Sequence, residues 1–457
     1  NPLLDGAAGL TLASETAIGK HAMECINMLN RLISHAESVV APGQTRHTVH
    51  PLVKDLEASN YLLDLKATST LVAPHGGNLV NRFLREPYDH SYLKSLNRVV
   101  LDQKSQMEVE QLATGTYSPL EGFMTKIDFH CVLSDMRLSD GTVWPIPIVL
   151  DVSKEVAETL CVGEQVALVD SEGDVVALLH LEEKYSFDKG KAAIQLYGTD
   201  SDQHPGVQMM MAMNPILLAG KLDLVKRRSS VTKEYELSPK QVRRLFEERG
   251  WTHVLGFHTR NVIHRAHEFI QRSAIESENC DGLFVHPVVG GKKPGDFATK
   301  YIVQSYVTML ENFYPSDKVV LAAFSTFSRY AGPREALFTA LCRKNFGCSH
   351  FIVGRDHTGV SNYYDPDASH KVFDQFPDIG IKVVKFEEVF YSKSAKDYVH
   401  KTGDSYREED RLAISGSTAR QMFERKEAPP SWFMRPEISE MILQAINNGE
   451  QVFVDMD

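Results

Sequence analysis

Residues 256–268 read Gly-Phe-His-Thr-Arg-Asn-Val-Ile-His-Arg-Ala-His-Glu and predict a turn between a strand and a helix. The apolar residues before it indicate a strand that ends at Thr259, and from Ile263 onward apolar residues recur at helical spacing. Open α/β sheets bind their ligands at such turns, beyond the carboxyl ends of the strands. The N–H groups that begin the helix also favour an anion. We therefore expect an anion-binding site here.

The polar side chains of this turn support that expectation. Arg260 supplies a guanidinium and Asn261 an amide, while His264 and His267 lie on one face of the first helical turn. Together they suit a polyanion. Two other interpretations of the histidines stay open. One is a zinc site with His258 as third ligand, although the H-E-x-x-H pattern is absent; the other is a pair of capping or packing side chains.

Strands and helices alternate on both sides of the turn, which predicts a parallel, doubly wound sheet. Ser238-Pro239-Lys240-Gln241 has the form of a capping box with proline at the first helical position, and Gly250 is a natural helix stop. The predicted strands are Thr252–Phe257, Gly282–Val288, Lys318–Phe324, His350–Gly354 and Ile381–Phe386. The helices between them begin near 263, 298, 333 and 367, and two more are expected at 417–425 and 436–448.

Residues 71–230 have a different pattern, of short strands separated by turns. The signals are a hairpin turn at 139–142, alternating apolar residues from 146 to 152, and two strands, Gln165–Val169 and Val175–Leu181. We expect a compact β-rich domain here, preceded by a polar linker at 41–70.

The composition limits the possible functions. The chain has 457 residues, a formal net charge of −11 and a pI near 5.9, which argue against nucleic acid as a partner. A local pocket can still bind an anionic substrate. No apolar run approaches the ~20 residues that cross a membrane. The six cysteines are scattered without a C-x-x-C pair, which predicts reduced thiols and a cytoplasmic location.

Residues 1–40 are similar to the last strand and helix of the pyruvate kinase barrel. Four residues match that family's turn, whereas Ala13 and Ser14 replace its Ser and Gly; the matches are Glu15, Thr16, Ala17 and Gly19. The chain begins with neither an initiator Met nor a signal-peptide pattern. We expect the tail of an upstream domain in a fusion protein. The alternative is a generic strand–helix piece.

Further polar loops follow predicted strands or precede a helix. Residues 354–359 read Gly-Arg-Asp-His-Thr-Gly and come directly after a strand. Residues 414–420 read Ile-Ser-Gly-Ser-Thr-Ala-Arg, where Ser415 and its neighbours can cap a helix or admit a phosphate. Arg329 and the cationic loop Gly290–Asp296 are lesser candidates, and each also reads as a solvated surface loop.

Taken together, these loops predict a site for a nucleoside triphosphate with a second anion beside it. The sequence has neither a Walker lysine loop nor a G-x-G-x-x-G turn. It shows no nucleophilic Ser or Cys beside a base. The mechanism that we expect is direct in-line attack at phosphorus, driven by positioning and charge neutralisation.

Residues 71–450 resemble the ATP sulfurylase (sulfate adenylyltransferase) family of nucleotidyltransferases. The motifs are Thr259-Arg260-Asn261, His264-Arg265-Ala266-His267, Gly332-Pro333-Arg334-Glu335-Ala336, Gly354-Arg355-Asp356-His357 and Ile414-Ser415-Gly416, with support from 118–124 and 286–290. The resemblance implies a PUA-like β domain at 71–230, a doubly wound nucleotidyltransferase domain at 231–389 and a small C-terminal α/β domain at 390–457. It further implies a homo-oligomer that converts ATP and sulfate to adenylyl sulfate and pyrophosphate.

The resemblance also implies roles for residues. Arg260, with His258 and the N–H of Thr358, would hold sulfate. Asn261 would meet the α-phosphate. The two histidines would meet the β- and γ-phosphates, and magnesium would arrive with ATP rather than on protein ligands. The catalytic set is then Thr259, Arg260, Asn261, His264 and His267, and the ATP-binding set Gly354, Arg355, Asp356, His357, Val389, Arg329 and Ser415.

Three positions depart from the family pattern. The family usually has Gln at His258, Pro at Val262 and Ala at Thr358. Because a histidine offers one donor or two according to its protonation, His258 predicts a pH-dependent affinity for sulfate. Residues 390–394 lack the cysteines of some members' zinc segment, so no protein-bound metal is expected.

Two other functions stay open. The chain can be an adenylyltransferase for another oxyanion, because His258 and Thr358 differ from the family. It can also be a catalytically silent nucleotide-binding module of a pyruvate-kinase-like fusion.

Overall fold

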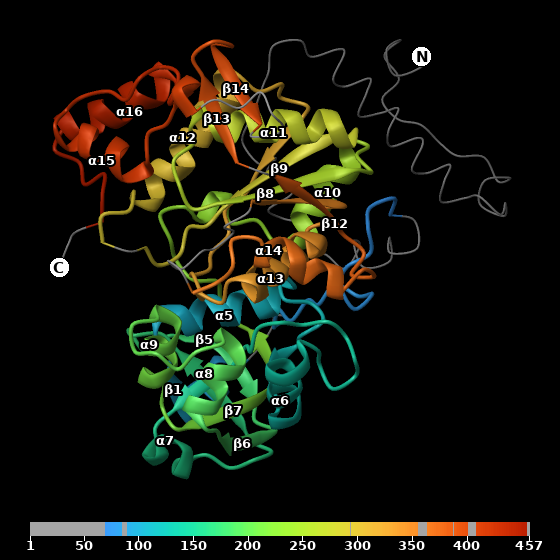
Figure 1. The fold of residues 1–457 in the computed structure, drawn as a ribbon. Helices are drawn as coiled ribbons and strands as arrows, with labels where there is room; N and C mark the ends of the chain where they lie inside the picture. The colour runs from blue at the N-terminus through green and yellow to red at the C-terminus, as the bar shows by residue number, and fades with distance from the viewer. Residues whose placement is uncertain are drawn as a thin grey trace, which may run out of the picture.

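Two larger sheets, one in each half of the chain, organise the protein (Figure 1). The computed structural model describes residues 69–84, 89–292, 294–354, 363–386, 388–400 and 408–454. The predicted segment 1–40 and nearly all of the predicted linker 41–70 lie outside these ranges. Within them, no helix is long and apolar enough to cross a membrane.

The first sheet is centred on the long strand β7 (Ile216–Leu224). Its order is β1-β4-β5-β7-β2, and β3 and β6 also pair with β7. Helix α5 packs against β7. The other elements are α4 (His90–Ser95), β1 (Arg98–Val100), α5 (Gln103–Thr114), β2 (Gly122–Phe123), α6 (Lys126–Asp135), β3 (Leu150–Val152), α7 (Lys154–Thr159), β4 (Gln165–Val169), β5 (Val175–His180), β6 (Glu183–Ser186), α8 (Lys189–Tyr197) and α9 (Pro205–Ala212).

The predicted strands of this half are confirmed in part. The strand at Gln165–Val169 is β4, and the next strand is β5. The alternating apolar residues from 146 to 152 are buried, but only Leu150–Val152 pairs as a strand. Prolines at 145 and 147 remove N–H donors that a longer ladder requires.

The second sheet is parallel and has the order β10-β9-β8-β11-β12, as the doubly wound prediction requires. Figure 1 shows α11 and α12 above the sheet and α13 and α14 below it. The elements are η4 (Lys233–Tyr235), α10 (Pro239–Glu248), β8 (Val254–Thr259), α11 (Arg265–Glu278), β9 (Gly282–Pro287), α12 (Thr299–Asn312), β10 (Val319–Leu321), α13 (Pro333–Asn345), β11 (His350–Gly354), α14 (Ala368–Lys371), η5 (Val372–Gln375) and β12 (Lys382–Phe386).

The predicted capping box begins α10. The Ser238 hydroxyl accepts from the N–H of Gln241, and the Gln241 side chain accepts from the N–H of Ser238 at 2.8 Å. Gly250 follows the helix with φ +67°, a conformation that glycine adopts without strain. Local sequence therefore sets where this helix begins and ends.

The last part of the chain packs onto the second sheet. It contains β13 (Val389–Ser392), β14 (Asp397–His400), η6 (Glu408–Asp410), β15 (Arg411–Leu412), α15 (Gly416–Glu424) and α16 (Pro436–Asn447). Strands β14-β13-β15 form a small antiparallel sheet. Phe423 and Ile442 share one buried cluster with Leu255 and Val285 of the parallel sheet. The two predicted helices are thus confirmed as α15 and α16.

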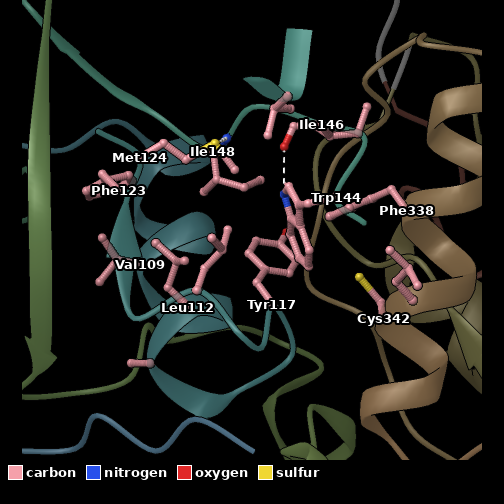
Figure 2. Close-up of a cluster of buried hydrophobic side chains, with 14 of the residues drawn as sticks. Val109, Leu112, Tyr117, Phe123, Met124, Trp144, Ile146, Ile148, Phe338 and Cys342 are labelled. Atoms are coloured by element: carbon pink, nitrogen blue, oxygen red, sulfur yellow. Dashed lines mark hydrogen bonds between the residues drawn. The ribbon is translucent and has the colours of Figure 1, made fainter. Parts of the chain in front are cut away.

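The two halves share a continuous apolar core (Figure 2). Trp144 and Tyr117 come from the first half, and both rings meet Phe338 of α13, with centroids 5.7 and 5.2 Å away. The indole of Trp144 donates to the carbonyl of Ile146 at 2.7 Å, so its polar atom is satisfied in the interior. The interface between the two halves is therefore apolar and buried, like the interior of one domain.

This shared core predicts that the halves unfold together. Phe338→Ala should lower the free energy of unfolding by about 3–5 kcal/mol, because it leaves a cavity between Trp144 and Tyr117. Urea unfolding, followed by tryptophan fluorescence and circular dichroism, should then give coincident transitions. Ile194→Ala, at a side chain that is 51% exposed, is the control and should change stability by less than about 0.5 kcal/mol. Separate transitions for the two probes in the unsubstituted chain would contradict the shared core.

Candidate active site

The carboxyl ends of β8 and β11 diverge. Strand β8 pairs with β9 from Val254 to Thr259, and β11 pairs with β12 from His350 to Gly354. Between β8 and β11 the register contains only Leu255 with His350 and Gly256 with Phe351. These strands are neighbours where the strand order reverses, which is where open α/β sheets bind ligands.

A cavity of about 330 Å³ fills this divergence. Residues from the ends of β8, β11 and β12 line it, together with α11, α13 and the segment 326–328 after β10. The predicted site residues that line it are His258, Thr259, Arg260, Asn261, His267 and Gly354. The fold therefore brings residues from two separate sequence motifs to one cavity.

One side of the cavity carries positive charge. The hydroxyl of Thr259 accepts from the N–H of Asn261 at 3.2 Å, and the side chains of Arg260 and Asn261 are exposed. The ammonium of Lys292 donates to the carbonyl of Val288 at 2.8 Å and approaches that of Arg260 at 3.4 Å. Burial lowers the pKa of Lys292 to about 8, and Arg260 lowers it further while Asp296 opposes the shift. Two adjacent cations of this kind favour a bound anion.

The paired histidines stack on each other at the start of α11. Their ring centroids are 3.8 Å apart, with Phe433 stacked on His264 and Phe257 edge-on to His267. His264 is the N-cap residue, and the Nδ1 atom of each ring is buried with no hydrogen-bond partner among the described residues. Burial lowers the pKa of His264 to about 4 and that of His267 well below its usual range. Both rings are therefore neutral at pH 7, and each keeps one N–H to donate.

The segment after β10 is held in a strained conformation beside the cavity. Tyr330 has φ +59°, which is rare for a bulky residue and needs external support. The carboxylate of Glu335 accepts from the N–H groups of Arg329 at 2.9 Å and Ala331 at 3.2 Å. The hydroxyl of Tyr364 donates to the Tyr330 carbonyl at 3.0 Å. Sequence reasoning assigned Glu335 no role beyond its motif, since no local pattern marks a side chain that supports a distant backbone.

The structure gives Arg329 a different partner from the predicted nucleotide. Its guanidinium is 2.7 Å from the Glu108 carboxylate and 2.9 Å from the Tyr117 hydroxyl, and it does not line the cavity. Burial raises the pKa of Glu108, and Arg329 offsets part of that rise. A buried cation needs such a carboxylate, so Arg329 joins the two halves of the chain rather than meeting ATP.

The other predicted ATP residues are placed as follows. Ser415 caps α15 by accepting from the N–H of Thr418 at 3.0 Å and lies outside the cavity lining, so its part in ATP binding stays a prediction. Val389 begins β13 and also lies outside the lining. Arg355, Asp356, His357 and Thr358 lie outside the described residues.

The zinc interpretation of the histidines requires at least a third protein ligand. In the described part of the chain, no group of three or more His, Cys, Asp or Glu side chains is arranged to hold a metal ion. Glu335 is the only carboxylate among the described residues that line the cavity, and it is already bonded to two backbone N–H groups. The described lining therefore contains more hydrogen-bond donors than carboxylates.

The sheet order and the cationic, donor-rich cavity at its switch point define a nucleotide-binding α/β protein. Comparison with known proteins narrows this class. A model of the ATP-sulfurylase family matches residues 233–445, and a model of the PUA-like domain matches residues 72–227.

Two relatives show the extent of the similarity. The sulfate adenylyltransferase of Nostoc punctiforme is 43% identical over 381 residues, which cover 82% of this chain and 97% of the relative. That of Cenarchaeum symbiosum is 41% identical over 374 residues, or 82% of this chain and 97% of the relative. A solved structure, the hexameric APS kinase from Thiobacillus denitrificans, superposes with a TM-score of 0.65 at 27% identity, covering 83% of this chain and 69% of that one. The chain belongs to the ATP sulfurylase family.

The neutral His264 predicts an acid-sensitive fold. Because burial lowers its pKa to about 4, the unfolded chain binds more protons than the folded one below about pH 6.5, and stability falls as the pH drops from 6.5 towards 4. His264 alone should cost about 2 kcal/mol between pH 7 and pH 5. Urea unfolding at both pH values should show a smaller difference in His264→Gln than in the parent. His130→Gln, at an exposed position on α6, is the control; equal differences in all three proteins would refute the shift.

Proposed function

We propose that this chain is a sulfate adenylyltransferase that joins sulfate to the α-phosphate of ATP and releases pyrophosphate. The observation that carries the proposal is the single cavity where Arg260, Asn261 and His267 meet at the divergence of β8 and β11. Family membership supports the same reaction. A chain with net charge −11 needs such a local concentration of donors to bind two anions together.

The oxyanion end of the cavity is the side with Arg260. A guanidinium offers two parallel N–H donors that match the oxygens of sulfate. Lys292 adds a second cation beside it, and His258 lines the same wall. The N–H of Thr358 remains part of the proposed sulfate site by family resemblance alone.

The leaving-group end is the stacked histidine pair. Neutral imidazoles donate hydrogen bonds to the β- and γ-phosphates, and the growing charge on pyrophosphate favours their protonation. Asn261 would contact the α-phosphate where attack occurs, and Thr259 holds the backbone of that turn. Magnesium would enter on the triphosphate as part of the substrate.

The reaction is a direct displacement. Sulfate oxygen attacks the α-phosphorus as the bond to the bridging oxygen of pyrophosphate breaks, so no group of the protein becomes covalently attached. Burial raises the pKa of the Cys342 thiol to about 12, which disfavours it as a nucleophile. Gly354 borders the proposed nucleotide pocket, where Arg355, Asp356, His357 and Val389 remain proposed contacts by resemblance.

The proposal extends to assembly and location. We place the enzyme in the cytoplasm as a homo-oligomer; the described cysteines are free thiols, and the similar APS kinase is named as hexameric. Because the PUA-like half shares its buried core with the second half, it would serve as a rigid support for the half that carries the cavity.

Exchange of labelled pyrophosphate into ATP tests the function. We expect exchange to require sulfate and to reject phosphate. Arg260→Gln should raise the KM for sulfate at least about tenfold and leave that for ATP within about twofold, because it removes a charge-assisted contact to one substrate. Lys300→Gln, which loses a surface pair with Glu450 and a cation–π contact with Tyr301 outside the cavity lining, is the control.

Two other outcomes of the exchange assay would each favour one of the alternative functions. Exchange that depends on an oxyanion other than sulfate would establish the alternative adenylyltransferase. ATP binding without any exchange would establish the silent module. If exchange is measured and His264→Ala abolishes it, the silent module is ruled out.

A further inference from the structure

Among the described residues, Arg343 is a buried cation without a counter-ion. Its side chain is fully buried in α13, and no described carboxylate lies within ion-pair distance. In the same part of the chain, its Nε and Nη1 atoms have no hydrogen-bond partner, and the guanidinium lies 4.6 Å from the ring centroid of Phe324. Burying an unpaired charge is expensive, so a group kept in this state calls for an explanation.

The guanidinium lies directly behind the cavity wall. Its Nη2 donates to the carbonyl of His286 and to Nδ1 of His258, both at 2.9 Å. A Cβ atom on Gly256 would come within 3.1 Å of the Arg343 side chain, so glycine there lets the strand lie close over it. His258 is therefore the link between Arg343 and the cavity, which it lines.

This contact sets the hydrogen position on His258. A guanidinium has only donors, so Nδ1 of the imidazole must accept and cannot carry a proton. The single ring hydrogen is then on Nε2. A second proton on Nδ1 would break the bond and place an imidazolium against a buried guanidinium.

We propose that Arg343 is a positioning residue that holds His258 as the neutral Nε2–H tautomer, so that the ring hydrogen of this cavity-lining residue stays on Nε2. The proposal rests on the proposed sulfate site. It replaces the prediction that sulfate affinity follows the protonation of His258. An amide can also accept from Arg343 with its oxygen and donate with its nitrogen, so histidine here is a functional substitute for the family's glutamine.

The charge of Arg343 has a second consequence. An unpaired guanidinium behind the oxyanion wall adds a fixed positive potential where water is excluded, and such preorganised charge acts strongly on a bound anion. Among the described residues, the other charged or titratable groups that line the cavity are Arg260, His267 and Glu335, and these face the same space as His258. These groups are present in every variant described below, so their titration contributes to each pH profile alike.

The first measurement is ¹⁵N NMR of the histidine-labelled protein, with His258→Gln to identify the His258 signals. We expect an unprotonated Nδ1 and a protonated Nε2 that do not titrate between pH 6 and 8. A protonated Nδ1, or an imidazolium that titrates in this range, would overturn the proposal. The result does not require sulfate turnover, so it is separate from failure of the proposed function.

The second measurement is the KM for sulfate against pH in the parent, His258→Gln, Arg343→Met and the double variant. We expect parallel profiles in the parent and His258→Gln. Arg343→Met should raise the KM about tenfold and add a new pH transition, because His258 is then free to change its protonation. The double variant should lack that transition.

If Arg343 had only a structural role, Arg343→Met would raise the KM for sulfate equally at all pH values, with either histidine or glutamine at position 258. That result would refute the proposal. Arg243→Met is the matched control, since Arg243 is also buried and donates to a backbone carbonyl, that of Val72. It should add no transition. If Arg343→Met does not fold, Arg343→Gln keeps a polar side chain without the charge and with an oxygen that can accept from Nδ1–H, so its profile should also acquire the transition.

Discussion

The short pairing of β8 with β11 is the constraint on which the site depends. These strands share two Cα pairs near their amino ends, while each stays paired with its outer neighbour to its carboxyl end. The parallel sheet therefore opens between β8 and β11, while β8 stays paired with β9 and β11 with β12. Backbone from β8 then turns into α11 at the opening, which brings Arg260, Asn261 and His267 to the cavity, with His264 stacked on His267.

The electrostatics of the cavity are local and opposite to those of the whole chain. The protein has a net charge of −11, yet Arg260, Lys292 and the buried Arg343 gather on the oxyanion side. Burial keeps the two histidines neutral. In the proposed reaction, one end of the cavity is therefore charged before substrate binds, whereas the other would gain charge with the leaving group. The strained backbone at Tyr330, supported by Glu335, directly follows the segment 326–328 that lines the cavity.

Sequence predicted the elements whose signals are local. The capping box at Ser238, the helix start at Pro333 and the strand ends at Thr259 and Gly354 all lie where the residues indicate. Predictions from sequence were less accurate for residues whose partners are determined by tertiary contacts. Arg329 reads as a loop cation, but its carboxylate partner, Glu108, lies more than two hundred residues earlier in the chain.

Arg343 is the clearest case of what sequence could not reveal. It stands in the last turn of α13, where a cation is ordinary for helix stability. Only the packing of α13 against β8 shows that it is buried and bonded to His258. Residues 355–362 lie outside the described ranges, so their predicted part in the nucleotide pocket stays a prediction.

The central claim is that one cavity holds ATP and sulfate side by side for direct attack on the α-phosphorus. The measurement that tests it most directly is the stereochemical course at that phosphorus, followed with ATP made chiral at the α position by oxygen isotopes. A single displacement inverts the configuration, and inversion is the result we predict. Retention would require two successive displacements through a covalent adenylyl-protein, and it would contradict the account.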